Sequence, residues 1–183
     1  MASVKRDKSG GFQKLDLALK QLSGIQTKTG WFPGAKYEDG TPVALAAAAN
    51  EFGHGKTPAR AFFRPTIAEQ EKIWRQDAAN GARAVLKGAA TGHDVMDALG
   101  ERAQEDVKQT INQITSPPLS PVTLELRAMK RRDPARRITG KTVGEAAARV
   151  HEQGYKLASG TPDKPLINTK LLITTLTHIT ESA

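Results

Sequence analysis

The sequence contains no cysteine, and aromatic residues make up only 5% of its 183 residues. Without cysteine the chain can form neither a disulfide framework nor a thiolate metal site. No run approaches the roughly 20 consecutive apolar residues that a membrane span needs, and the charged N-terminus is not followed by an apolar run of signal-peptide length. We therefore expect a soluble protein that folds in a reducing cytoplasm.

Residue patterns typical of catalytic and metal sites are also missing. The four histidines lie in different predicted elements, and none has a partner at the spacing of metal ligands. The sequence GHGKT at 53–57 lacks the first glycine of a phosphate-binding loop, and a helix rather than a strand precedes it. No pattern pairs a nucleophile with a general base. We therefore expect no enzymatic activity, no cofactor and no metal ion.

Positive charge is present, and it is concentrated. The net charge is +8, and residues 127–137 hold six basic residues against one acid, so +5 of the +8 lies there. These six residues are Arg127, Lys130, Arg131, Arg132, Arg136 and Arg137. Such a run is often only solvated. The alternatives are contact with an acidic protein or with DNA phosphates, the latter without sequence preference because no aromatic residue in the run offers a stacking platform.

The hydrophobic pattern predicts two long central helices. Apolar residues recur at helical spacing over about 65–90 and again over 94–114. Shorter helical patterns cover residues 12–22 and 43–52. Thr41 suits the N-cap of the second of these, Pro42 its first position and Gly53 its end.

Each end of the chain contains a predicted strand, at residues 25–32 and 171–179, where β-branched and alternating residues are frequent. We expect the two strands to pair in a small antiparallel sheet packed against the long helices, which makes the fold class α+β. Residues 120–160 are predicted to be a basic helical insertion, with helices at 122–132 and 143–155. The whole chain, 1–183, is predicted to be a single domain.

The sequence PARAFFRP at 58–65 links the helix at 43–52 to the first long helix. Proline disfavours helical dihedrals in the residue before it, so we expect this link to be extended. With a period of two, Arg60, Phe62 and Arg64 then share one side.

Two roles for these side chains remain open. In the first, Arg60 and Arg64 pair locally with the carboxylate of Glu51 and brace the loop. In the second, the two arginines and Phe62, with Glu51, contact a neighbouring copy of the chain, since arginine and aromatic residues are favoured at protein interfaces.

Three separated blocks of sequence resemble a known family. They are GWFPGAKYEDGTPVA at 30–44, NEFG with PARAFFRP at 50–65, and KPLINTKLLITTLTHI at 164–179. Their order resembles that of the tail-completion or neck proteins of tailed bacteriophages, a family that includes minor tail proteins of the lambda Z type. Residues 120–160 depart from that pattern, so the resemblance implies nothing about the insertion.

The resemblance implies a structural virion protein that joins the tail to the head. Its partners would be copies of itself in a ring of six, the head-side connector, and the tail terminator or tube proteins, with genomic DNA passing through the ring. It would assemble in the host cytoplasm and remain in the neck or tail of the virion, without membrane contact. The alternative from a different class is a basic nucleic-acid-binding protein that uses residues 127–137.

Overall fold

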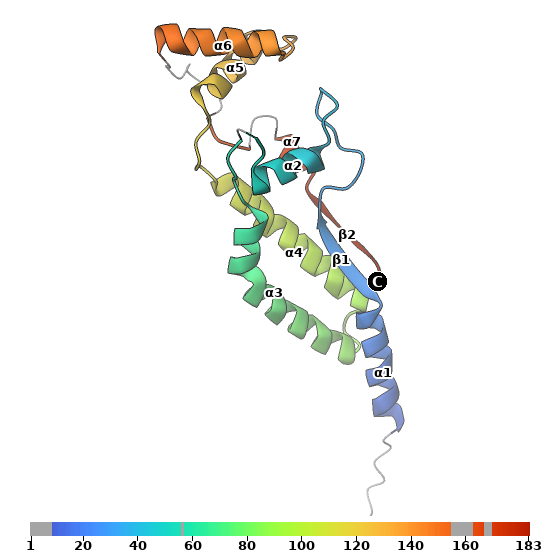
Figure 1. The fold of residues 1–183 in the computed structure, drawn as a ribbon. Helices are drawn as coiled ribbons and strands as arrows, with labels where there is room; N and C mark the ends of the chain where they lie inside the picture. The colour runs from blue at the N-terminus through green and yellow to red at the C-terminus, as the bar shows by residue number, and fades with distance from the viewer. Residues whose placement is uncertain (1–8, 56, 155–162, 167–169) are drawn as a thin grey trace, which may run out of the picture.

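The structure, a computed structural model, describes residues 9–55, 57–154, 163–166 and 170–183 (Figure 1). Within these ranges the chain forms seven helices and a two-stranded antiparallel sheet, which confirms the predicted α+β class. The elements in chain order are α1 (Ser9–Ser23), β1 (Ile25–Gly30), α2 (Val43–Phe52), α3 (Phe63–Leu86), α4 (Gly92–Gln113), α5 (Pro121–Arg132), α6 (Gly140–Gln153), α7 (Leu171–Thr174) and β2 (Thr177–Ser182).

The two strands come from opposite ends of the chain, as predicted, with Ile25 opposite Ser182 and Gly30 opposite Thr177. The predicted boundaries are wrong, however, because β1 ends at Gly30 and β2 begins only at Thr177. Residues 171–174 form helix α7 instead. A strand would also put Leu172 and Leu176 on one face, but about 13 Å apart. The helical turn brings them to within about 6 Å of each other in the same core, and this packing overrides the strand propensity of the β-branched residues around them.

Helix α4 lies between the sheet and α3 (Figure 1). Of the two long helices, it is therefore α4 that packs on the sheet, whereas both were predicted to do so. Gly100 marks the closest approach, since an added Cβ would lie 2.3 Å from Thr27 Oγ1 and 2.7 Å from His178 Cδ2. Thr29 Oγ1 also donates to the Gly100 carbonyl, and His178 Nδ1 lies 2.9 Å from Gln104 Oε1.

The main core joins α2, the start of α3, the C-terminal half of α4, and α7. Its buried residues are Val43, Ala47, Phe62, Val107, Ile111, Leu172 and Leu176. Trp31, just beyond β1, packs against this core and donates its indole N–H to the Leu172 carbonyl at 2.8 Å. A smaller cluster of Ala18, Val85 and Val95 joins α1 to α3 and α4.

The predicted insertion is a helical hairpin of α5 and α6, which pack on each other at one end of the molecule (Figure 1). Ser120 caps α5 by accepting from the Thr123 amide, and Thr139 begins α6 with a capping box. Because of that cap, α6 starts at Gly140, three residues before the predicted start at 143. The predicted end of this helix at 155 lies outside the described residues.

Candidate functional site

The junction between α2 and α3 is organised by the carboxylate of Glu51, at the end of α2. Its Oε2 accepts hydrogen bonds from the amides of Phe62 and Phe63, at 2.7 and 2.9 Å, and its Oε1 accepts one from the amide of Arg64 at 3.1 Å. The first N–H groups of a helix have no partner within it, and the N-cap residue Phe62 has no side chain that could accept from them. Glu51 therefore caps α3 from a different helix.

The environment of Glu51 keeps its carboxylate ionised. Burial raises the pKa of Glu51, but the amide bonds from Phe62 and Phe63, together with the guanidinium and amide of Arg64, outweigh that effect and hold the pKa below its usual value. The positive end of the α3 dipole acts in the same direction.

Arg64 is the one predicted site residue that both braces the junction and faces solvent. Its Nε lies 3.0 Å from Glu51 Oε1, and its Nη2 donates to the Glu51 carbonyl at 2.6 Å. The guanidinium also lies 5.2 Å from the centre of the Phe52 ring, a cation–π contact on the surface. The local brace predicted for Arg64 and Glu51 is thus confirmed, and the exposed part of the junction is Arg64 with Phe52.

Arg60 has neither of the two roles predicted for it. Its guanidinium is buried and donates from Nε to the Pro117 carbonyl at 2.8 Å and from Nη2 to the Pro118 carbonyl at 3.0 Å. The predicted pairing of Arg60 with Glu51 is therefore wrong. Arg60 instead ties the link between α2 and α3 to the turn that follows α4.

The prediction that Phe62 faces a neighbouring copy is also wrong for this conformation, since its side chain has no exposed area. Its ring packs edge-on to Trp31, with ring centres 5.5 Å apart, and against Phe63 at 5.4 Å. The strand-like alternation fails because α3 already begins at Phe63, before the predicted start at Pro65. The period of two therefore ends at Phe62, which turns into the core.

Sequence reasoning missed Phe52, which is largely exposed beside Arg64. Neighbouring side chains on a helix point about 100° apart, so Glu51 and Phe52 cannot both face the same core. Phe52 could have been found only from the burial of Glu51. Once the Glu51 carboxylate is known to accept from the three amides at the start of α3, its neighbour Phe52 must point to another side of α2.

The basic residues of 127–137 are partly neutralised by acids from outside that segment. Lys130 pairs with Glu38 at 2.6 Å, Arg132 with Glu125 at 3.8 Å, and Arg136 with Glu145. Arg127 donates from Nη1 to the Lys164 carbonyl at 3.0 Å, while Arg131 and Arg137 are exposed. The local surplus of positive charge is therefore smaller than the sequence count.

The structure also brings Arg60 and Arg127, which the sequence placed in separate sites, to one opening of about 400 Å³ between the junction and α5. Burial, and then the nearby charge of Arg60, lower the pKa of Arg127, while Asp163 acts in the opposite direction. Both guanidinium groups already donate to backbone carbonyls there. Arg60 and Arg127 therefore hold the segments around this opening together, at the place where the body of the protein meets the hairpin of α5 and α6.

Among the residues that the structure describes, no three His, Asp or Glu side chains are placed to hold a metal ion. Nor is any described helix long and apolar enough to cross a membrane. Comparisons of the chain with protein-family models, with curated proteins and with solved structures found no match.

Proposed function

We propose that this chain is a structural, non-enzymatic component of a tailed-phage virion, and that it joins tail to head connector as part of a ring of its own copies. The observation that supports assembly with its own copies is the amount of surface left exposed, whereas the role in a phage virion rests on the resemblance of the three blocks. The chain exposes 12367 Å², whereas a compact monomer of 19.7 kDa exposes about 8,600 Å².

Residues outside the described ranges do not account for the whole surplus. Even if those 20 residues are counted as fully extended chain, about 1,300 Å² of surplus remains over a compact body formed by the rest. A specific interface buries about 800 Å² on each partner. A surplus of this order is what contact with neighbouring subunits on two sides would cover.

Large apolar side chains form part of the exposed surface. Several large hydrophobic side chains on α1, α2 and α3 are at least 40% exposed, among them Phe12, Leu19, Leu45, Phe52 and Ile67. Single exposed leucines are normal on a protein surface, but several large apolar side chains left exposed on three helices favour contact with a partner.

The three blocks that carry the family resemblance meet in one core. Trp31 and Val43 come from the first block, Phe62 from the second, and Leu172 and Leu176 from the third. Their separation in sequence and their contact in space support the view that the blocks maintain a common fold rather than a catalytic site. This is the pattern expected when the shared property of a family is a structural unit.

Electron microscopy of phage particles made without this chain tests the proposal. We expect full heads and complete tails that accumulate separately, because the junction between them would lack a component. Joined, normal particles would refute the assignment. Full heads in a sample that contains no tails at all, free or attached, would also contradict it, since they would place the protein in tail assembly rather than at the junction.

A further inference from the structure

The charge of Arg60 is buried without a negative partner. Arg60 is only 6% exposed, and its guanidinium stays ionised when it is buried. Its Nε and Nη2 donate to the carbonyls of Pro117 and Pro118, and its Nη1 makes no hydrogen bond within the described part of the chain. Carbonyl oxygens accept these bonds but bring no negative charge. Because removing a charge from water is costly, buried charges in proteins are normally paired with opposite ones.

Other charged residues of this protein follow that rule. Glu51, which is also buried, pairs with Arg64. Five further arginines pair with carboxylates although they are more exposed than Arg60, namely Arg75, Arg102, Arg132, Arg136 and Arg149. Burial lowers the pKa of Arg60 with no opposing effect of a nearby acid. Beyond residue 8, the residues that the structure does not describe include no aspartate or glutamate. A negative partner for Arg60 is therefore not found in this part of the chain.

Arg60 lines the opening of about 400 Å³ between the junction and α5, together with Arg127. Seven of the eleven described residues around this opening have polar side chains, and none of the eleven is acidic. Burial, and then the charge of Arg60, lower the pKa of Arg127, so the two guanidinium groups are close enough to repel each other. Asp163 opposes this effect, but it is exposed and lies outside the lining. The opening therefore has an excess of positive charge.

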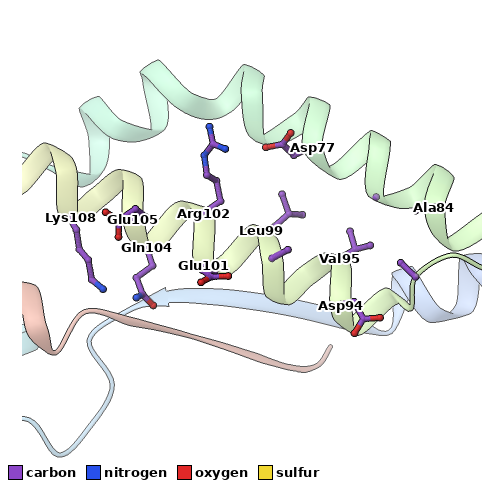
Figure 2. A pocket seen from close by; sticks show the side chains of 13 residues that line it. Asp77, Ala84, Asp94, Val95, Leu99, Glu101, Arg102, Gln104, Glu105 and Lys108 are labelled. Atoms are coloured by element: carbon purple, nitrogen blue, oxygen red, sulfur yellow. The ribbon is translucent and has the colours of Figure 1, made fainter.

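The larger opening, between α3 and α4, has no such excess (Figure 2). Figure 2 shows Glu101, Arg102 and Glu105 along one stretch of α4, so charges of both signs lie side by side there. None of the charged residues around this opening is buried. Its two walls are also in contact, since a Cβ added at Gly81 would lie 2.4 Å from Val95 Cγ1. Nothing in this opening requires a ligand.

Neutral hydrogen-bond donors surround the opening beside Arg60. The hydroxyls of Ser120 and Thr123 share one hydrogen bond of 2.8 Å, which leaves one of the two O–H groups able to donate to a ligand. Tyr37 also lines the opening, and burial, followed by the charge of Asp39, raises the pKa of Tyr37, so its phenol keeps its proton. Ser120 is the N-cap of α5, whose N-terminus is the positive end of the helix dipole. The donors thus come from several directions, which suits an anion with oxygens on more than one side.

We propose that this opening binds a phosphate group, either as free phosphate or as the monoester of a small molecule. Two guanidinium groups match the charge of about −1.5 to −2 that a phosphate monoester carries at neutral pH, and arginine binds phosphate through two parallel N–H groups. A carboxylate is planar and carries a single charge, so it would satisfy fewer of these donors. The backbone phosphates of duplex DNA are held on a wide, stiff helix and cannot reach a guanidinium as deeply buried as that of Arg60.

The size of the opening leaves room for more than the phosphate. Pockets for small molecules have volumes of about 300–1,000 Å³, and this opening has about 400 Å³. Leu119 and Leu166, with the ring of Tyr37, add apolar surface to its lining. A small organic group attached to the phosphate is therefore accommodated. This inference goes beyond the proposed function and does not rest on it, so either can fail without the other.

Isothermal titration calorimetry of the full chain with inorganic phosphate tests the proposal, in about 0.15 M chloride to screen weak surface contacts. We expect saturable binding of one phosphate per chain, with a dissociation constant of about 1 mM or lower. A second titration, with phenyl phosphate, distinguishes the two forms of the ligand. Tighter binding than that of phosphate identifies a monoester, and equal or weaker binding identifies free phosphate. No saturable binding of either compound, or equal binding of acetate, overturns the proposal.

Substitutions at the opening test where the phosphate binds. Arg127→Gln removes one guanidinium but keeps an N–H donor, and it is expected to weaken phosphate binding at least about tenfold, because a hydrogen bond to a charged group is lost. Arg137→Gln is the matched control, since it removes the same charge from the same basic segment at an exposed position outside the opening. We expect it to leave the dissociation constant unchanged. Equal weakening by both variants would show a general effect of charge and would overturn the site.

Arg60→Lys gives a further check, because lysine keeps the positive charge but loses the planar fork of N–H groups. Provided that circular dichroism shows the variant to be folded, we expect it too to weaken phosphate binding at least about tenfold. The result for Arg127→Gln decides the proposal if Arg60→Lys does not fold, since Arg60 also holds the carbonyls of Pro117 and Pro118.

Discussion

Replacement of Glu51 by alanine tests whether one carboxylate organises the junction between α2 and α3. The substitution removes the acceptor of three amides, of Phe62, Phe63 and Arg64, at the start of a 24-residue helix. Loss of a helix cap costs about 0.5–2 kcal/mol, and a buried donor left without an acceptor costs about 1–3 kcal/mol. We therefore expect Glu51→Ala to lower the free energy of unfolding by about 3 kcal/mol, a large part of the 5–15 kcal/mol typical of a domain.

Urea unfolding followed by tryptophan fluorescence measures this change, because Trp31 packs against Phe62 at the junction. The measurement is made at a concentration at which the chain is monomeric. Glu71→Ala is the matched control, since Glu71 is an exposed carboxylate whose partner is Arg75 on the same helix; we expect an effect within about 0.5 kcal/mol. If Glu51→Ala costs no more than Glu71→Ala, the carboxylate does not cap α3 and the account of the junction is refuted.

The remaining predictions concern pH, packing and DNA. The folded pKa of Glu51 is depressed, so its contribution is fully present above the unfolded pKa of about 4.3 and is lost as the pH falls through the folded value. The stability difference between wild type and Glu51→Gln should accordingly shrink from pH 6 to pH 3, and a constant difference would contradict the depressed pKa. Gly100→Ala should lower the free energy of unfolding by about 1–3 kcal/mol because the added Cβ meets the sheet. Gly144→Ala in α6, where the added Cβ has open space, should raise it by about 0.5–1 kcal/mol. Thermal unfolding of both variants checks the two signs. Because acids neutralise part of the 127–137 segment, we expect the protein not to retard duplex DNA in a gel-shift assay at physiological salt. If the protein does retard DNA, and Arg131→Glu with Arg137→Glu abolishes the retardation, the nucleic-acid-binding alternative is favoured.

The long helices could be predicted from the sequence because burial of one helical face makes apolar residues recur at helical spacing. The pairing of the terminal strands could be predicted because each end of the chain contains one segment rich in β-branched residues. The strand predicted at 171–179 was wrong because Leu172 and Leu176 both enter the main core, and that requirement comes from α2 and α4 rather than from local propensity. Only the later part of the predicted strand remains in β2.

At the candidate site, the sequence predicts the contact between residues that are near in the chain, but not the contacts between residues that are far apart. The brace between Glu51 and Arg64 joins residues near in sequence, and it was anticipated. The partners of Arg60 are carbonyls after α4, and the acids that neutralise 127–137 include Glu38, so neither could be read from local sequence. The apolar side of α1 is visible in the sequence as a helical pattern, but its exposure depends on the tertiary arrangement.

The proposal that this chain joins heads to tails by assembly rather than by catalysis is tested most directly by titration. Heads and tails made without the chain are mixed with increasing amounts of the purified protein, and joined particles are counted by electron microscopy. We predict that joining saturates at a fixed number of chains per particle, and that the chain is retained in the joined particles. Complete joining by far fewer chains than particles, with the chain left free in solution, would contradict the account.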